Sequence, residues 1–314
     1  MKGYRRSSIL ILLLCSLLLA FSTTCNGEAI ATEAEQELEA EASAEENEEE
    51  EAGVAEEVAE PEVAGVPGLE PLPPRPQKVE FKASDGHQHT GRYFPAAVNP
   101  VPVIVLMHWA PGDQDDWVEI AYWLQNRGLG GKSEGGDPWL DPTWFPLLEE
   151  EESYAVFTFT FRGCDGGCKD FLPDGWALDA KAAMDVASQL EGVDPHQIVV
   201  IGASIGADGA VDGCSLHNTQ ATTCVGALSL SPGNYLDMRF DEMVNNLGKE
   251  DPPKPVWCIT SERESEICEE IIEENYKVFI YDEPYHGMEL IQPELTEPTM
   301  MLIYKFIHFA IGVK

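Results

Sequence analysis

The sequence predicts an α/β domain in which a mostly parallel sheet carries helices on both faces and is preceded by an antiparallel hairpin. Short apolar segments alternate with segments of helical periodicity, as in chains that build parallel sheets. The apolar run at 103–107 has no polar interruption, which is typical of a strand covered on both faces. Residues 79–83 alternate apolar and polar, and Asp85-Gly86 marks a turn before residues 89–94. These two segments predict the hairpin.

The remaining elements follow in chain order. Trp117, Ile120 and Leu124 lie on one stripe of the first predicted helix. The expected strands are 79–83, 89–94, 103–107, 154–161, 197–203, 225–230, 256–260 and 277–281. The expected helices are 115–127, 176–190, 205–212 and 299–311.

The chain of 314 residues divides into three predicted parts, a signal peptide at 1–24, a tether at 25–77 and the folded domain at 78–314. Three basic residues precede an apolar run at 9–21, the layout of a secretory signal. The run is shorter than the roughly 20 apolar residues of a membrane-spanning helix. We therefore expect a secreted or cell-surface protein.

Two ways of processing this leader remain open. Ser22-Thr23-Thr24-Cys25 resembles a bacterial lipobox, with Ser22 where Leu is usual, and would make Cys25 a lipidated N-terminus. Cleavage after Ala31 would instead remove Cys25 with the leader. Membrane contact is expected only through a lipid anchor at Cys25.

The charge of the chain is strongly acidic and uneven. There are 19 Lys and Arg against 56 Asp and Glu, a formal net charge of -37. Residues 28–70 contain 17 glutamates and no Lys or Arg, and 67–76 is rich in proline, so this part predicts a disordered tether. The balance argues against nucleic acid as a partner and disfavours strongly anionic substrates.

Six cysteines fall within the predicted domain. An even number in an exported domain favours disulfides, and neighbours along the chain suggest Cys164–Cys168, Cys214–Cys224 and Cys258–Cys268. A zinc site is disfavoured because no second close pair of Cys or His accompanies Cys164 and Cys168. His87 and His89 share a strand face, but they too have no third ligand nearby, and a half-exposed strand explains them better.

Ser204 is the predicted nucleophile. It lies in Gly202-Ala203-Ser204-Ile205-Gly206, directly between a predicted strand and a predicted helix. This sharp turn exposes the serine at the start of a helix, where free N–H groups favour negative charge. Small residues two before and two after it let neighbouring chain pass close by.

A serine hydroxyl needs a general base, and His286 is the candidate. It follows the last predicted strand, where a loop would present it at the carboxyl edge of the sheet. The other histidines fit less well, since His108 ends an earlier strand and His308 lies within a helix.

Residues 78–314 resemble the α/β-hydrolase superfamily, nearest to dienelactone-hydrolase-like and related esterase families. The matching pieces are His108-Trp109-Ala110-Pro111-Gly112, Trp117, Phe161-Arg162-Gly163, the 202–206 turn and His286-Gly287. The resemblance implies hydrolysis of a small-molecule ester through an acyl-enzyme, without a metal or organic cofactor. Dienelactone hydrolases use a Cys nucleophile where this chain has Ser204, so dienelactone is disfavoured as substrate.

The resemblance also implies the remaining site residues. The triad acid should follow the strand at 256–260, where Glu264 is preferred over Glu262, with Asp237 as an outside candidate. The oxyanion donors should be the backbone N–H of Ile205 and that of Trp109 or Ala110.

The sequence leaves the substrate open. Peptidases and acyl-aminoacyl hydrolases share this fold, and a non-catalytic binding protein could retain it. Residues 128–152 form a long insertion with Trp139, Trp144 and Phe145. These aromatics could either cover the site or pack on the sheet.

Overall fold

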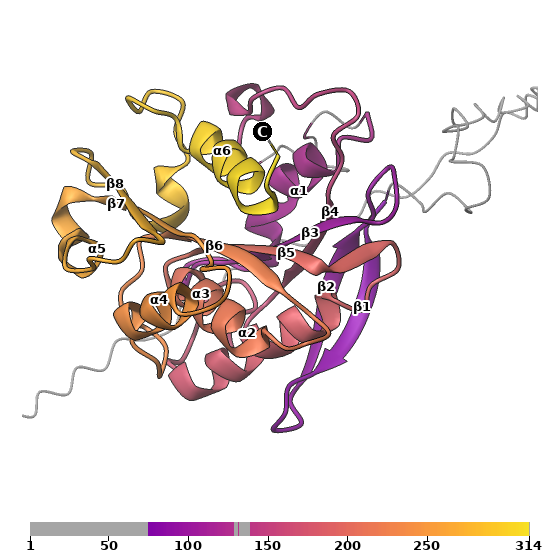
Figure 1. The fold of residues 1–314 in the computed structure, drawn as a ribbon, viewed down its shortest axis with the longest axis horizontal. Coiled ribbons are helices and arrows are strands. Elements are labelled where there is room, and N and C mark those ends of the chain that lie inside the picture. Colours follow the sequence, from indigo (N-terminus) through magenta and orange to yellow (C-terminus); the bar gives the residue numbers. More distant parts are fainter. Residues whose placement is uncertain (1–74, 129–130, 132–138, 314) are drawn as a thin grey trace, which may run out of the picture. The chain divides into compact units, whose positions relative to one another are not determined.

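A computed structural model describes residues 75–128, 131 and 139–313 (Figure 1). The predicted leader, Cys25 and the tether up to residue 74 lie outside the described residues. The described chain contains an eight-stranded sheet in the order β1-β2-β4-β3-β5-β6-β7-β8. β1 pairs antiparallel with β2, and β2 pairs antiparallel with β4, whereas all other neighbours are parallel. The strands are β1 Gln77–Lys82, β2 Gln88–Phe94, β3 Val101–Met107, β4 Ala155–Phe159, β5 Val193–Ala203, β6 Cys224–Leu230, β7 Val256–Ser261 and β8 Tyr276–Tyr281.

Helices cover both faces of the sheet, as the sequence predicts. α1 (Val118–Gln125) and α6 (Thr299–Ile311) lie on one face, and α2 (Pro173–Ala187), α3 (Ile205–His217) and α4 (Phe240–Gly248) lie on the other (Figure 1). Each face has its own buried cluster, with Trp117 and Phe306 in the first and Trp176 and Phe240 in the second. The strands between them bury side chains in both directions, which explains their unbroken apolar sequences.

All eight predicted strands are present, and the differences concern boundaries and short helices. α1 is preceded by a 3-10 turn at Gln114–Trp117, where the Asp113 carboxylate accepts the Asp115 N–H. α2 begins at Pro173, which has a backbone angle suited to the first turn of a helix. Two helices were not predicted, α4 and the short α5 (Glu266–Glu269). α4 buries Phe240, Met243, Val244 and Leu247, a spacing that its sequence also displays.

Three disulfides join the cysteines that are neighbours along the chain, as predicted: Cys164–Cys168, Cys214–Cys224 and Cys258–Cys268. The second joins the last turn of α3 to the start of β6, and the third joins β7 to α5. The first closes a loop after β4.

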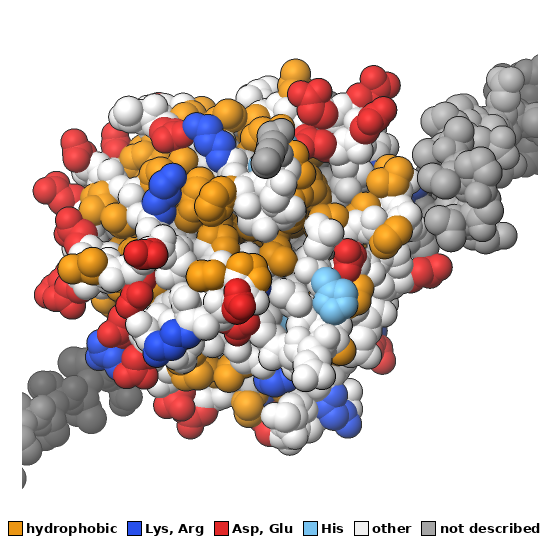
Figure 2. All heavy atoms as spheres, in the orientation of Figure 1, with side chains coloured by type: hydrophobic (Ala, Val, Ile, Leu, Met, Phe, Trp, Pro, Cys, Tyr) orange, Lys and Arg blue, Asp and Glu red, His pale blue; other side chains and the backbone are white. Residues whose placement is uncertain are grey.

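The face seen in Figure 1 carries many acidic side chains and few basic ones (Figure 2). This distribution agrees with the net charge of -37. Within the described residues, no helix has both the length and the apolar character that crossing a membrane requires.

Candidate active site

The predicted site residues meet at one edge of the sheet. β5, β6, β7 and β8 run parallel, so their carboxyl ends lie side by side. Ser204 follows β5, Glu264 follows β7 and His286 follows β8. Residues far apart in sequence are therefore brought to one place by strand order alone.

Ser204 lies on a sharp turn that requires glycine on both sides. Its backbone has φ 52° and ψ -117°, a left-handed conformation that a non-glycine residue adopts only under strain. A Cβ on Gly202 would lie 1.8 Å from the Gly206 carbonyl oxygen. A Cβ on Gly206 would lie 2.3 Å from the carbonyl oxygen of Met107 in β3. The two glycines thus let the strand turn directly into α3.

Three side chains form a continuous hydrogen-bonded chain. His286 Nε2 lies 2.9 Å from Ser204 Oγ, and His286 Nδ1 lies 2.8 Å from Glu264 Oε2. The Ser204 residue is 4% exposed, whereas about a third of the His286 side chain reaches solvent. In this arrangement the serine can pass its proton to an imidazole whose other nitrogen is held by a carboxylate.

The structure distinguishes the three carboxylates that the sequence left open. Glu264 contacts His286, whereas Glu262 and Asp237 are exposed to solvent. Glu262 and Glu264 occupy the same 3-10 turn, so only one of them points toward the imidazole.

Glu264 is held in its ionised form. Burial alone would raise its pKa, but hydrogen bonds with His286 and Ser231 outweigh burial and lower the pKa below its ordinary value. Nearby Arg263 acts in the same direction. A carboxylate in this state stabilises the imidazolium that forms when His286 accepts a proton.

The loop after β3 faces the start of α3. Within the described residues, the backbone N–H groups of Ile205, Trp109 and Ala110 donate to no protein acceptor. Such free donors beside a nucleophile are what an oxyanion requires. The structure brings the loop and Ser204 together, as expected from the sequence, but it does not distinguish Trp109 from Ala110 as donor.

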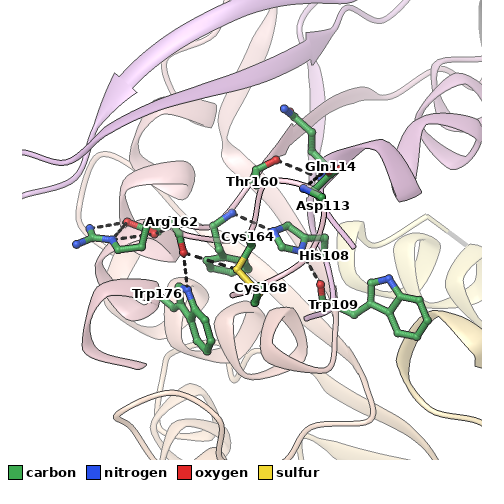
Figure 3. Close-up of a disulfide and its surroundings, with 12 residues drawn as sticks. His108, Trp109, Asp113, Gln114, Thr160, Arg162, Cys164, Cys168 and Trp176 are labelled. Carbon is green, nitrogen blue, oxygen red and sulfur yellow. Dashed lines mark hydrogen bonds and ion pairs between the residues drawn. A yellow bond between two sulfur atoms is a disulfide. The ribbon is translucent and has the colours of Figure 1, made fainter. Parts of the chain in front are cut away.

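This loop is fixed by the segment that follows β4 (Figure 3). His108 Nδ1 donates to the Trp109 carbonyl at 2.7 Å, and His108 Nε2 accepts the Phe161 N–H at 2.9 Å. Burial lowers the pKa of His108 to about 4, which keeps the imidazole neutral and able to accept this bond. Beside the disulfide, the Cys168 N–H donates to the Ala110 carbonyl at 2.7 Å.

Aromatic side chains form a wall next to Ser204. The Trp109 indole N–H donates to Asp116 at 2.6 Å, and a Cβ on Gly287 would lie 3.2 Å from its ring. Burial and neighbouring acids raise the pKa of Asp116 to about 6. Trp139 meets Trp109 edge to face at 6.1 Å and is 47% exposed.

The insertion therefore divides its aromatics between the two expected roles. Phe145 is buried in the core and Trp144 packs against it. Trp139 instead extends the wall beside the site.

Comparisons with known structures identify this architecture. No family model matches the chain. The esterase Pf2001 of Pyrococcus furiosus superposes with a TM-score of 0.51 at 17% identity, covering 79% of this chain and 100% of the esterase. The α/β hydrolase GrgF of Penicillium sp. sh18 gives a TM-score of 0.52 at 14% identity, covering 77% of this chain and 100% of GrgF. The chain has an α/β-hydrolase fold.

Other matches share the α/β-hydrolase fold or a part of the sequence. The acylaminoacyl peptidase of Pyrococcus horikoshii gives a TM-score of 0.50 at 14% identity, covering 77% of this chain and 42% of the peptidase. The uncharacterized Mycobacterium tuberculosis proteins MT2364 and Rv2307c are 27% identical over 152 residues, which is 48% of this chain. The chain spans 45% of the length of these curated relatives.

Two residues of this α/β-hydrolase fold stand at the site without having been predicted. Ser231 is fully buried beside Glu264, and the Tyr235 ring meets the His286 ring edge on at 6.4 Å. Both belong to Ser231-Pro232-Gly233-Asn234-Tyr235, which directly follows β6. These turn-forming residues directly follow a strand whose carboxyl end lies at the site. That position is the sequence signal from which Ser231 and Tyr235 could have been predicted.

Proposed function

We propose that this protein is an exported serine hydrolase that cleaves carboxylic esters through Ser204, His286 and Glu264. The observation that carries the proposal is the chain of contacts from Ser204 Oγ through His286 to Glu264, at 2.9 and 2.8 Å, on a strained strand-to-helix turn. Esterases and hydrolases among proteins of the same fold support the hydrolase class.

The chemistry follows from the roles of the three side chains. Ser204 Oγ attacks the carbonyl carbon while its proton passes to His286 Nε2, and Glu264 stabilises the imidazolium. The N–H of Ile205 and one N–H of the Trp109-Ala110 pair stabilise the oxyanion. His286 then gives its proton to the departing alcohol, and water hydrolyses the acyl-enzyme by the same steps in reverse.

A fluorophosphonate probe tests the nucleophile on the full chain. The wild-type protein should be labelled at Ser204, and Ser204→Ala should abolish labelling. Ser84→Ala removes an exposed serine outside the site and serves as the matched control. An unlabelled wild-type protein, or equal labelling of Ser204→Ala, would refute the serine-hydrolase assignment and favour a non-catalytic binding protein.

Esters and amides of the same acyl group test the reaction. We expect measurable hydrolysis of p-nitrophenyl butyrate and slower hydrolysis of the butyryl anilide. A preference for the anilide, or for N-acylated amino-acid amides, would replace the esterase assignment by the peptidase or acyl-aminoacyl hydrolase alternative.

Export is supported by two observations. Basic residues precede the apolar run at 9–21, and all six cysteines of the folded domain are paired in disulfides, which persist in oxidising compartments. We propose a secreted or cell-surface protein, with lipidation at Cys25 as the means of attachment. Mass spectrometry of the mature N-terminus tests both statements. A lipidated Cys25 supports the anchor, a start at residue 32 supports secretion without one, and an intact Met1 contradicts export.

A further inference from the structure

Asp116 lies beside the site but belongs neither to the triad nor to the oxyanion donors. It is part of the 3-10 turn at Gln114–Trp117, directly before α1. Its carboxylate accepts the indole N–H of Trp109 at 2.6 Å. Trp109 lies in the loop after β3, whose backbone N–H groups are candidate oxyanion donors. An acidic side chain is therefore bonded directly to this loop.

The turn that carries Asp116 is anchored on both sides. The Asp116 N–H donates to the Asp113 carbonyl at 3.2 Å, and the Asp113 carboxylate accepts the Asp115 N–H at 2.9 Å. Trp117, the next residue, is fully buried in the core. The backbone at Asp116 is therefore fixed by the turn and by the core, independently of the loop after β3.

The space around this hydrogen bond admits no side chain at position 112. A Cβ on Gly112 would lie 1.7 Å from Asp116 Oδ2 and 2.7 Å from Trp109 Nε1. A larger residue there would push the carboxylate away from the indole. The glycine therefore leaves room for this particular contact.

The Trp109 ring borders the nucleophile at another of its edges. A Cβ on Gly287 would lie 3.2 Å from Cε3 of the ring and 3.6 Å from Ser204 Cβ. Gly287 directly follows His286 and has a left-handed φ of 56°. The indole thus lies between the carboxylate of Asp116, which holds its N–H, and the backbone that carries the candidate base.

The backbone of Trp109 is held through its carbonyl. This carbonyl accepts bonds from His108 Nδ1 at 2.7 Å and from the Gly112 N–H at 3.3 Å. Because a trans peptide group is planar, the N–H of Ala110 points away from the Trp109 carbonyl. The direction of this candidate donor therefore depends on how Trp109 is oriented, and Asp116 holds the side chain of that residue.

The carboxylate occupies a place that disfavours its charge. Burial and three neighbouring acids raise the pKa of Asp116 to about 6, although the hydrogen bond from Trp109 lowers it. The three acids are Asp113, Asp115 and Glu119. An acid placed where burial and like charge oppose its ionisation is typical of a functional position.

We propose that Asp116 is a positioning residue of the candidate active site, which orients Trp109 and thereby the oxyanion donor of its loop. This inference rests on the proposed function. Asp116 takes no part in proton transfer. It accepts one hydrogen bond from the indole and keeps the loop in the geometry that the developing oxyanion requires. Its effect should fall on the transition state, and so on kcat rather than on KM.

The test replaces Asp116 in the full-length protein and follows the hydrolysis of p-nitrophenyl butyrate. Asp116→Ala removes the acceptor and should lower kcat about 10-fold, with KM changed by less than about twofold. Asp116→Asn retains an oxygen that can accept the indole N–H, so its kcat should stay within about threefold of wild type. Asp115→Ala removes the adjacent carboxylate, which pairs with Arg92, and should leave both constants unchanged.

A second variant tests whether Asp116 acts through Trp109. Trp109→Phe keeps an aromatic ring but removes the N–H, so it should lower kcat at least as much as Asp116→Ala. In the double variant, Asp116→Ala should cause little loss beyond that of Trp109→Phe. Equal losses from Asp116→Ala in the two backgrounds, or an Asp116→Asn variant as slow as Asp116→Ala, would overturn the inference.

The readouts separate this inference from a loss of folding and from failure of the proposed function. Melting temperatures within a few degrees of wild type ensure that the kinetics describe folded enzymes. If Asp116→Ala does not fold, Trp109→Phe carries the test, and a wild-type kcat in that variant would overturn the role of Asp116. If the wild-type protein neither reacts with the fluorophosphonate nor cleaves the ester, the proposed function itself fails.

Discussion

The hydroxyl oxygen of Ser231 accepts the backbone N–H of Gly287 at 2.9 Å. This bond ties the residue that follows His286 to the end of β6. The Ser231 side chain also lowers the pKa of the nearby Glu264 carboxyl. One buried serine therefore holds the backbone next to the candidate base and influences the charge of the candidate acid.

Ser231→Ala should weaken catalysis without removing any reacting group. Losing about 1–1.5 kcal/mol of hydrogen bonding would lower kcat roughly 10-fold, with little change in KM. The pKa of Glu264 should also rise, because the Ser231 hydrogen bond lowers it. The acid limb of the kcat/KM profile should then move to higher pH. An unshifted acid limb would show that Ser231 does not act through Glu264, and Ser84→Ala provides the control.

Glu264→Gln tests the triad acid against its neighbour. An amide cannot stabilise the imidazolium, so kcat should fall by about 10²- to 10⁴-fold. Glu262→Gln changes an exposed residue of the same 3-10 turn and should retain full activity. Steady-state rates of the two variants show which glutamate supports His286. A larger loss of kcat in Glu262→Gln than in Glu264→Gln would make Glu262 the triad acid.

Removing the disulfide beside the Trp109-Ala110 loop should affect activity more than removing a distant one. Cys168 donates its N–H to Ala110, and the Gly166 N–H donates to Asp113 at 3.0 Å. Replacing Cys164 and Cys168 by serine should loosen this support and lower kcat several-fold. Replacing Cys214 and Cys224, which lie at the opposite end of β6, should mainly lower stability, by about 2–3 kcal/mol. Equal kcat in the two double variants would contradict a role for the first disulfide in the site.

Asp212 predicts a stability that declines toward alkaline pH. It is fully buried in α3, neither carboxyl oxygen has a hydrogen-bond partner among the described residues, and burial beside Asp208 and Asp237 raises its pKa to about 8. The unfolded chain, with a carboxyl pKa near 3.8, binds fewer protons than the folded chain between those two values. The free energy of unfolding should therefore fall as pH rises through this window.

Asp212→Asn removes the charge at nearly constant shape. Urea unfolding should show the variant to be on the order of a few kcal/mol more stable than wild type at pH 9, with little difference at pH 4. Asp170→Asn, at an exposed carboxylate, should show no such dependence. A variant that is less stable than wild type at pH 9 would contradict a neutral Asp212.

Local sequence determined the elements of this protein and the turn that carries Ser204. Short apolar runs and apolar/polar alternation indicated all eight strands, and Gly202 and Gly206 fit the turn because no other residue leaves room for the adjacent carbonyls. α4 was not predicted, although the spacing of Phe240 and Leu247 marks its apolar stripe. The sequence therefore contained the signal for this helix. His286 could be selected because it follows the last strand of a parallel sheet.

Only the tertiary structure decided which side chains reach the serine. Glu262 and Glu264 have the same chemistry and differ only in where a single 3-10 turn directs them, a choice made by packing. Ser231 and Tyr235 acquire their contacts because β6 lies between β5 and β7, which no spacing along the chain reveals. Sequence thus specifies local conformation through residue shape and periodicity, whereas the site depends on neighbours that strand order brings together.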